Sequence, residues 1–300
     1  MIQVIKRRNI WFTIEIITVI LSIIFLIMWG LRPGMDFTGG SLLEIKFSQN
    51  RPDVGTLKDN LKEVEGLGSD FVVQPVGNDK MIIRFQNTEE SMHQALLTKL
   101  NENYQGVTQD RYESIGPSIG KELKTKAFYA VFVAVLGIII YIAWAFRKVS
   151  WPVKSWKYGL CAIIALIHDI LVVIGVFALL GHFMNVEIDL PFIAALLTIL
   201  GYSVHDTIVV FDRIRENLGR VVKTSFEDIV NRSINETFAR SINTTVATLL
   251  SLIAIYLFGG ESIKFFALAL IIGITSGTYS SIFIASPLLV VWENFSRSKK

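Results

Sequence analysis

The sequence contains a single cysteine and none of the short motifs of the common hydrolases. With only Cys161, the chain cannot form an internal disulfide, and we expect this residue to act as a small apolar packing residue. The spacings of a phosphate-binding loop, of a serine-hydrolase elbow and of a zinc hydrolase are also missing. We therefore predict that the protein is not an enzyme and that it binds no cofactor.

Charge is scarce over long stretches of the chain, which is 52% hydrophobic. Six apolar runs are long enough to be transmembrane helices, because about 20 apolar residues cross the ~30 Å hydrocarbon core of a bilayer. The second, fifth and sixth runs contain no Asp, Glu, Lys or Arg. The six runs are Ile10–Leu31, Ala127–Phe146, Tyr158–Leu180, Leu190–Phe211, Ser241–Phe258 and Phe265–Trp292.

The first run follows Lys6, Arg7 and Arg8, as the apolar core of a secretory signal would. Its apolar stretch is longer than the usual signal core of about 7–15 residues, and no small-residue cleavage site follows it. We interpret it as an uncleaved membrane anchor.

Lysine and arginine are distributed unevenly between the loops of this six-span arrangement. With an inside N-terminus, the inside segments carry 16 of the 29 Lys and Arg residues, whereas the short outside loops carry only Lys264. Segment 32–126 carries the other 12, but it is long enough to be translocated regardless of its charge. This pattern predicts a multi-pass protein of the bacterial cytoplasmic membrane with both termini in the cytoplasm.

Segment 32–126 is the one large soluble stretch, and its pattern predicts the element order β–α–β–β–α–β. Alternating and β-rich runs predict four strands, amphipathic runs predict two helices, and Gly77-Asn78-Asp79 is a hairpin signal. This order is typical of a small ferredoxin-like domain, in which we expect His93 to be solvated. The strands are predicted over 41–47, 71–76, 80–85 and 107–115, and the helices over 53–65 and 89–104.

The sequence therefore predicts an α-helical polytopic membrane protein with six transmembrane helices and one small α+β domain outside the cytoplasm. Residues 1–31 are expected to form the N-terminus and the first span, residues 32–126 the ferredoxin-like domain with its hinges, and residues 127–300 the other five spans.

Glycine- and proline-rich segments flank the predicted outer domain. The first contains Gly34, Gly39 and Gly40, and the second contains Gly116 and Pro117. Because glycine and proline favour unusual or fixed backbone angles, these segments are either turns at helix ends or hinges on which the outer domain moves.

Other segments suggest contacts with lipid or with neighbouring helices. Gly273 and Gly277 lie four residues apart in the sixth run, a spacing that lets helices approach closely in lipid. The inside segment 147–157 alternates basic residues with tryptophan, which suits lipid headgroups better than nucleic acid. Residues 226–234 have the pattern of a short interfacial helix.

Two His-Asp pairs lie inside apolar runs, where ionisable side chains are expensive and usually functional. The rise of 1.5 Å per residue places His168-Asp169 ~16 Å from the cytoplasmic surface and His205-Asp206 ~7 Å from it. Arg240 begins the fifth run from the inside.

A buried aspartate near an arginine can bind and release a proton, because desolvation favours the neutral form and the guanidinium favours the charged form. Asp206 with Arg240 is therefore the candidate proton relay, and the histidines are candidates to pass the proton on. The alternatives are a hydrogen bond from Asp206 to a neighbouring helix, a surface anchor at Arg240, and local pairing of Asp169 with His168. Asp212 belongs either to the relay or to an interfacial charge cluster.

A metal site is not expected. Adjacent residues on a helix point about 100° apart, so a His-Asp dipeptide is a poor chelate. We assign no role to Glu15, which lies one turn inside the first run and can extend towards the surface.

Several segments resemble the signature sequences of the SecF family. They are GMDFTGG at 34–40, IGPSIGKEL at 115–123, GYSVHDTIVVFDRIREN at 201–217, NETFAR at 235–240 and LFGG at 257–260. The resemblance covers the full chain in the expected order, and the segment at 201–217 is the most specific part. The family more often has Asn where this chain has His205, so the role of His205 stays open.

The resemblance implies a subunit related to the resistance-nodulation-division exporters that acts with SecD and the SecYEG channel. Within that family, proton flow drives late steps of preprotein translocation, and the positions of Asp206 and Arg240 are implicated in proton transport. Further implied partners are the preprotein, YajC- or YidC-type accessory proteins and membrane lipid, with no nucleic acid. The alternatives are half of a proton-coupled small-molecule exporter and a passive assembly scaffold.

Overall fold

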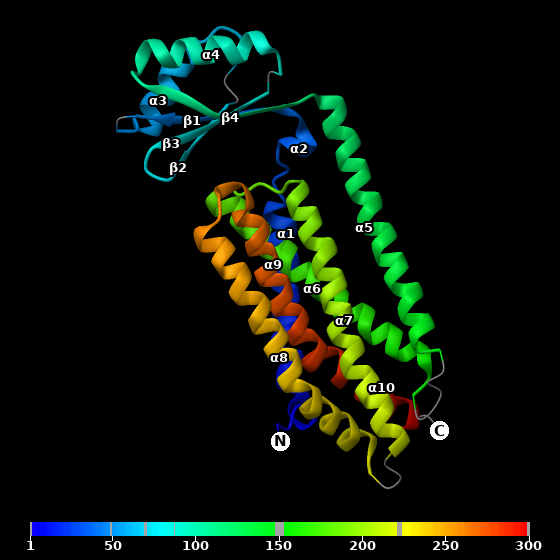
Figure 1. The fold of residues 1–300 in the computed structure, drawn as a ribbon. Coiled ribbons are helices and arrows are strands. Elements are labelled where there is room, and N and C mark those ends of the chain that lie inside the picture. Colours follow the sequence, from blue (N-terminus) through cyan, green and yellow to red (C-terminus); the bar gives the residue numbers. More distant parts are fainter. Residues whose placement is uncertain are drawn as a thin grey trace. The chain divides into compact units, whose positions relative to one another are not determined.

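The computed structural model describes residues 2–48, 50–68, 71–86, 88–147, 153–220 and 224–298 (Figure 1). It divides into two compact units. Pro33–Phe128 form what we call the small unit, and Met1–Arg32 with Tyr129–Lys300 form the helical unit.

The helical unit contains helical segments that are long and apolar enough to span a membrane, and the six found among the described residues confirm the predicted number. Two spans contain more than one element: the first begins in the short helix η1, and the last passes from α9 through a π-helical turn, η2, into α10. The elements are η1 (Ile5–Arg7), α1 (Arg8–Trp29), α5 (Pro117–Ala145), α6 (Ser155–Met184), α7 (Leu190–Arg220), α8 (Phe226–Phe258), α9 (Glu261–Ser280), η2 (Ser281–Ala285) and α10 (Ser286–Ser298), and α5 begins within the small unit.

Helix α8 begins at Phe226, well before the predicted span, so residues 226–234 are helical as predicted. The prediction that this helix is short was wrong: it continues into the span, because residues 226–258 contain no glycine or proline. The Ser225 hydroxyl caps it by accepting a hydrogen bond from the Asp228 amide at 3.2 Å. Of the basic and tryptophan-rich segment 147–157, residues 148–152 lie outside the described part of the chain.

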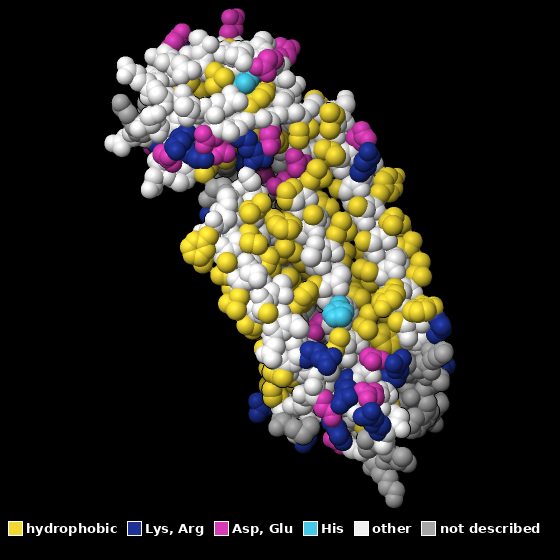
Figure 2. Space-filling view, viewed as in Figure 1, with side chains coloured by type: hydrophobic (Ala, Val, Ile, Leu, Met, Phe, Trp, Pro, Cys, Tyr) yellow, Lys and Arg dark blue, Asp and Glu magenta, His cyan; other side chains and the backbone are white. Residues whose placement is uncertain are grey.

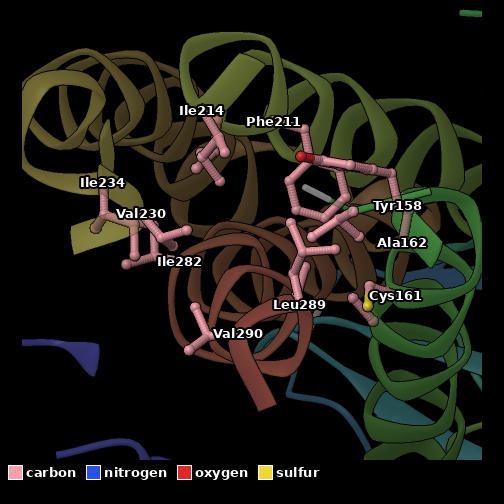
Figure 3. Packing of buried hydrophobic residues seen from close by; sticks show 14 of the residues in the cluster. Tyr158, Cys161, Ala162, Phe211, Ile214, Val230, Ile234, Ile282, Leu289 and Val290 are labelled. Atoms are coloured by element: carbon pink, nitrogen blue, oxygen red, sulfur yellow. The ribbon is translucent and has the colours of Figure 1, made fainter. Parts of the chain in front are cut away.

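Large apolar side chains from α6, α7, α8 and α10 interlock in the core of the helical unit (Figure 3). The Tyr158 ring packs edge-on against Phe211, with centroids 5.3 Å apart. Cys161 is buried beside them as a free thiol, as the sequence predicted. Figure 2 shows apolar side chains along these helices and charged side chains gathered at the end where both termini lie.

The small unit is a four-stranded antiparallel sheet with the strand order β2-β3-β1-β4. Apolar side chains of α3 and α4 pack with those of the sheet in one core. The predicted strands and helices are confirmed within a few residues at their ends, whereas the ferredoxin-like assignment and the domain limits remain predictions. The elements are α2 (Met35–Thr38), β1 (Gly40–Phe47), α3 (Val54–Leu61), β2 (Val72–Val76), β3 (Lys80–Phe85), α4 (Glu90–Asn103) and β4 (Val107–Ile115).

His93 on α4 is buried, so the prediction that it is solvated was wrong. Its ring stacks on Tyr112 of β4 at a centroid distance of 3.7 Å. Its two ring nitrogens lie 2.8 Å from Glu90 and Gln109 oxygens. Sequence periodicity along α4 could not reveal these contacts, because Tyr112 and Gln109 come from the neighbouring strand.

The two glycine-rich segments predicted as hinges lie against each other within the small unit. Gly40 pairs with Ile115 in the sheet, and Gly39 and Gly40 have positive φ angles of 75° and 124°. A Cβ on Gly39 would lie 2.9 Å from the Cα of Pro117, the first residue of α5. Glycine is therefore required here by close backbone contact, and movement at these segments remains a prediction.

Candidate functional site

Many polar side chains of the helical unit are buried between apolar helices. Such groups need hydrogen-bond partners, since an unpaired buried polar group is costly. On the membrane helices they include Glu15, Ser22, His168, Asp169, Ser203, Asp206, Thr207, Ser241, Thr245, Ser276, Thr278, Ser280, Ser281 and Ser286. Two of them, Asp206 and Asp169, are carboxylates that accept hydrogen bonds from hydroxyl groups of neighbouring helices, and each is the centre of a cluster.

Asp206 lies on the buried face of α7 and is 7% exposed. One carboxylate oxygen, Oδ1, accepts a hydrogen bond from the Ser241 hydroxyl of α8 at 2.6 Å. The other, Oδ2, is buried and has no hydrogen-bond partner in the described part of the chain. A protonated Oδ2 leaves less buried charge uncompensated than an ionised one, so this position is chemically suited to bind a proton.

Arg240 precedes Ser241 on α8, but its side chain is exposed. It lines a pocket together with Val209, Asp212, Arg213, Glu216, Glu236 and Thr237. Ser241, rather than Arg240, is therefore the residue through which α8 contacts the Asp206 carboxylate in this structure.

The two predicted His-Asp pairs have different environments. His205 is exposed although Asp206 beside it is buried, because successive helical residues point about 100° apart. His168 and Asp169, by contrast, are 6% and 0% exposed. The structure therefore buries one complete pair and only the aspartate of the other.

Asp169 accepts hydrogen bonds from side chains of two other helices. Ser203 of α7 donates to Oδ2 at 2.5 Å, while Ser276 and Ser280 of α9 donate at 2.9 and 2.8 Å. The Nδ1 atom of His168 lies 3.1 Å from Oδ1. These contacts join α6, α7 and α9 at one fully buried carboxylate, which goes beyond the local pairing that the sequence allowed.

His168 also contacts Glu15 of α1 through its other ring nitrogen, Nε2. The Glu15 side chain is 10% exposed, so it does not extend to the surface. The sequence contained a signal for this residue, namely a carboxylate inside an apolar run, but it gave no partner.

Hydroxyl groups lie between the two clusters. Ser203, which donates to Asp169, also has its carbonyl within 3.5 Å of the Ser281 hydroxyl. The Ser281 and Thr207 hydroxyls are 2.8 Å apart, and Thr207 follows Asp206. Ser281 begins the π-helical turn η2, a type of distortion that often occurs at functional sites.

Gly273 and Gly277 allow α9 to approach α7 closely. A Cβ on Gly277 would lie 3.0 Å from the Ser203 Cβ, and one on Gly273 would overlap the Ile199 side chain. Thr245 of α8 and Thr278 of α9 also share a hydrogen bond of 2.6 Å. These close contacts bring the α9 serines within reach of Asp169.

Asp212 belongs to a charged cluster at the end of α7 and pairs with Arg215. In the same cluster Glu236 accepts from Arg213, Asn217 and Arg232 at 2.6, 2.8 and 2.8 Å. This arrangement supports the structural alternative for Asp212. Among the described residues, no group of three or more His, Cys, Asp or Glu side chains has the arrangement of a metal site.

Two family models match the chain. The model described as "Protein export membrane protein SecD/SecF, C-terminal" matches residues 95–295, and the one described as "SecD/SecF GG Motif" matches residues 24–50. The second match includes Gly39 and Gly40, where a Cβ would approach the backbone of Pro117 and of Phe85, respectively.

Curated relatives are similar over almost the whole chain. The protein translocase subunit SecF of Thermobaculum terrenum is 44% identical, and the alignment covers 98% of this chain and 95% of that protein. The corresponding subunit of Anaerolinea thermophila is 41% identical, with the same coverage of both chains.

A solved structure has the same fold. The crystal structure of SecDF, a translocon-associated membrane protein from Thermus, superposes with a TM-score of 0.85 and 34% sequence identity over 98% of this chain. The match spans only 39% of that SecDF chain.

Proposed function

Because the chain belongs to the SecF family of protein translocase subunits, a non-enzymatic part of bacterial protein export, we propose that it couples proton movement to preprotein translocation. It is a multi-pass protein of the bacterial inner membrane. Its partner in protein export is SecD, since the chain matches about two-fifths of the length of a SecDF protein. We further infer that the complex acts on the SecYEG channel, with YajC- or YidC-type proteins as accessory partners.

The observation that carries the proton role is the Asp206 carboxylate. It is buried among membrane helices, with Oδ1 bonded to α8 and Oδ2 without a hydrogen-bond partner in the described residues. A proton on Oδ2 removes a buried charge, and its loss restores one. Across a membrane potential of 100 mV, each charge moved is worth about 2.3 kcal/mol, which is comparable to several hydrogen bonds.

Helix α8 is the element that can respond to this charge. It carries Ser241, which donates to Asp206, and the neighbouring Arg240, whose guanidinium is exposed. When Asp206 is ionised, attraction to the Arg240 guanidinium favours a rotation of α8 that brings the two charges together. When Asp206 is neutral, the hydrogen bond from Ser241 to Oδ1 is sufficient and this attraction is absent.

The proposed orientation places both termini and the charged cluster around Glu236 in the cytoplasm. It is supported by the excess of Lys and Arg in the corresponding segments. The small unit then lies on the outer side, where it moves on its glycine-rich segments during translocation.

Export in cells that depend on this subunit tests the proposal. Asp206→Asn keeps the size of the side chain but cannot bind and release a proton. We expect proton-dependent export to be abolished while SecD still copurifies with the variant. Normal export by Asp206→Asn and by Arg240→Ala would instead support the alternative that the chain is a passive assembly scaffold. In that case Gly277→Leu, which disturbs packing against Ser203, should still impair assembly.

Gentle purification from the native membrane tests the identity of the partners. We expect SecD and the channel subunits to copurify. Efflux of a small molecule by vesicles that contain the purified complex would instead favour the exporter alternative.

A further inference from the structure

A buried chain of three ionisable side chains connects α1 with α6, and the Asp206 mechanism does not use it. Glu15 of α1 contacts Nε2 of His168, and Nδ1 of the same ring lies 3.1 Å from Asp169. All three side chains are at least nine-tenths buried. Ionisable groups at such depth are retained for function more often than for stability.

The hydrogen-bond partners fix where the protons lie. Three serine hydroxyls donate to Asp169, so this carboxylate is an acceptor on all sides. His168 must therefore carry a hydrogen on Nδ1 to donate to it. The Nε2 atom is left to face Glu15 Oε2, and neither atom has another hydrogen-bond partner among the described residues.

One proton satisfies the Glu15–His168 contact, whichever atom carries it. With the proton on Nε2, an imidazolium faces a carboxylate; with the proton on Oε2, a carboxylic acid donates to a neutral imidazole. Removal of that proton leaves a carboxylate facing the Nε2 lone pair. Addition of a second proton leaves a neutral carboxylic acid beside an imidazolium, which removes the attraction between opposite charges even where Oε2 still accepts from Nε2–H. Loss of the proton therefore breaks the hydrogen bond, and gain of a second proton weakens the contact.

The other groups around this contact are few. Tyr279 of α9 lies within electrostatic range of Glu15, and its hydroxyl is buried without a hydrogen-bond partner in the described residues. Its ring is 6.3 Å from that of Trp11 on α1. From α7, Asp206 lies within electrostatic range of Asp169 and of the exposed His205. The groups that act electrostatically on His168 are Asp169 and Glu15, and both are carboxylates. Within this buried chain of three side chains, the imidazole is the group that can carry a positive charge.

We propose that Glu15 and His168 form a second proton-binding site. With one bound proton the site holds α1 against α6, and when the site loses that proton or gains another, α1 is released from α6. The released proton passes to water, and an added proton comes from water. Asp169 fixes the histidine ring, and its hydrogen bond from Ser203 connects the site to the helix that carries Asp206. Its importance for export depends on the proposed function, whereas proton binding itself does not.

Helix α1 is well placed to pass on such a change. It packs along α6, where Gly175 lies directly against Ser22, and only Gly30, Leu31 and Arg32 separate its end from the small unit. Release of the Glu15 contact therefore loosens the membrane helix that leads directly into the small unit.

Infrared spectroscopy of the full-length protein in lipid nanodiscs, titrated between acid and alkaline pH, tests the site. Protonated carboxyl groups absorb separately from carboxylates, and the probe is the proton itself. We expect a titrating carboxyl band in the wild type that is absent in Glu15→Gln and shifted in Asp169→Asn. The band should remain in Asp206→Asn and in Ser22→Ala, a buried α1 variant without a titrating group.

Identical titrating carboxyl bands in the wild type and Glu15→Gln would overturn the proposal. If Glu15→Gln does not fold, Glu15→Asp keeps the carboxyl group but shortens its reach, and an unshifted band in that variant would equally contradict it. Loss of the band in Glu15→Gln supports the site even if Asp206→Asn exports normally, so the two proposals can fail separately.

A distance measurement tests the release of α1. Spin labels at exposed Ile17 and Ile167 report on the separation of α1 and α6 in a Cys161→Ala background. We expect the separation to change with pH in the wild-type sequence and to stay constant over the same range in Glu15→Gln. A separation that changes equally in both would contradict the proposed release.

Discussion

Replacing Gly273 with alanine puts a methyl group where the Ile199 side chain already lies. The new Cβ would be less than 3.0 Å from three carbons of Ile199, whereas carbon atoms normally pack about 3.5–4.0 Å apart. Ile199 is fully buried and cannot move aside freely. Such overpacking costs about 1–3 kcal/mol.

Alanine also favours the helix by about 1 kcal/mol relative to glycine, so the steric effect must be separated from propensity. Gly201→Ala on α7 provides the matched control, because a Cβ there meets nothing within 4 Å. We expect Gly273→Ala to be less stable than Gly201→Ala by about 1–3 kcal/mol, which corresponds to several degrees in unfolding temperature for a chain of this size.

The assay is thermal unfolding of the detergent-purified protein, followed by fluorescence-detected size exclusion. Ile199→Ala removes the three carbons involved, so the double variant should be no less stable than Ile199→Ala alone. Equal stabilities for Gly273→Ala and Gly201→Ala, or additive effects in the double variant, would refute the close α7–α9 packing.

Three further predictions concern other contacts. In the same unfolding assay, Glu236→Gln should lower the free energy of unfolding by about 1–3 kcal/mol, because charged hydrogen bonds to α7 are lost. Asp212→Asn removes an exposed ion pair with Arg215 and should change that free energy by less than about 1 kcal/mol. Asn231→Ala should expose the N-terminal segment to protease, because the buried Ile5 amide loses its acceptor; unchanged cleavage would contradict this. Hydrogen bonds from the Gln94 amide and from the His93 ring lower the pKa of Glu90 in the folded protein. The ionised Glu90 carboxylate therefore stabilises the fold fully above its unfolded pKa of about 4.3, and this stabilisation is lost as the pH falls through the lower pKa of the folded state. Hydrogen exchange of α4 should therefore be faster in Glu90→Gln than in the wild type at pH ~6, and the two rates should converge in more acidic solution.

The sequence predicted the elements well and their contacts less well. Apolar runs revealed the six spans because their length must match the bilayer. The strands of the small unit followed from alternation, but His93 was misplaced because Tyr112 covers it from a neighbouring strand.

The candidate site shows the same limit. The sequence showed that Asp206 is a carboxylate inside an apolar run, but it could not show the hydrogen bond from Ser241, because partners on other helices are set by packing. Glu15 had a clear sequence signal, but only the fold brings it to His168.

Preprotein translocation into inverted inner-membrane vesicles tests most directly whether Asp206 binds the coupling proton. The quantity to measure is the ratio of translocation rates with and without a proton gradient, for the wild type, Asp206→Asn and the control Asp212→Asn. We expect the gradient to accelerate translocation in the wild type and in Asp212→Asn. In Asp206→Asn the ratio should fall to about one, because asparagine cannot bind and release a proton and so cannot respond to the gradient. Full stimulation in Asp206→Asn, with the complex assembled, would contradict the proton role of this residue.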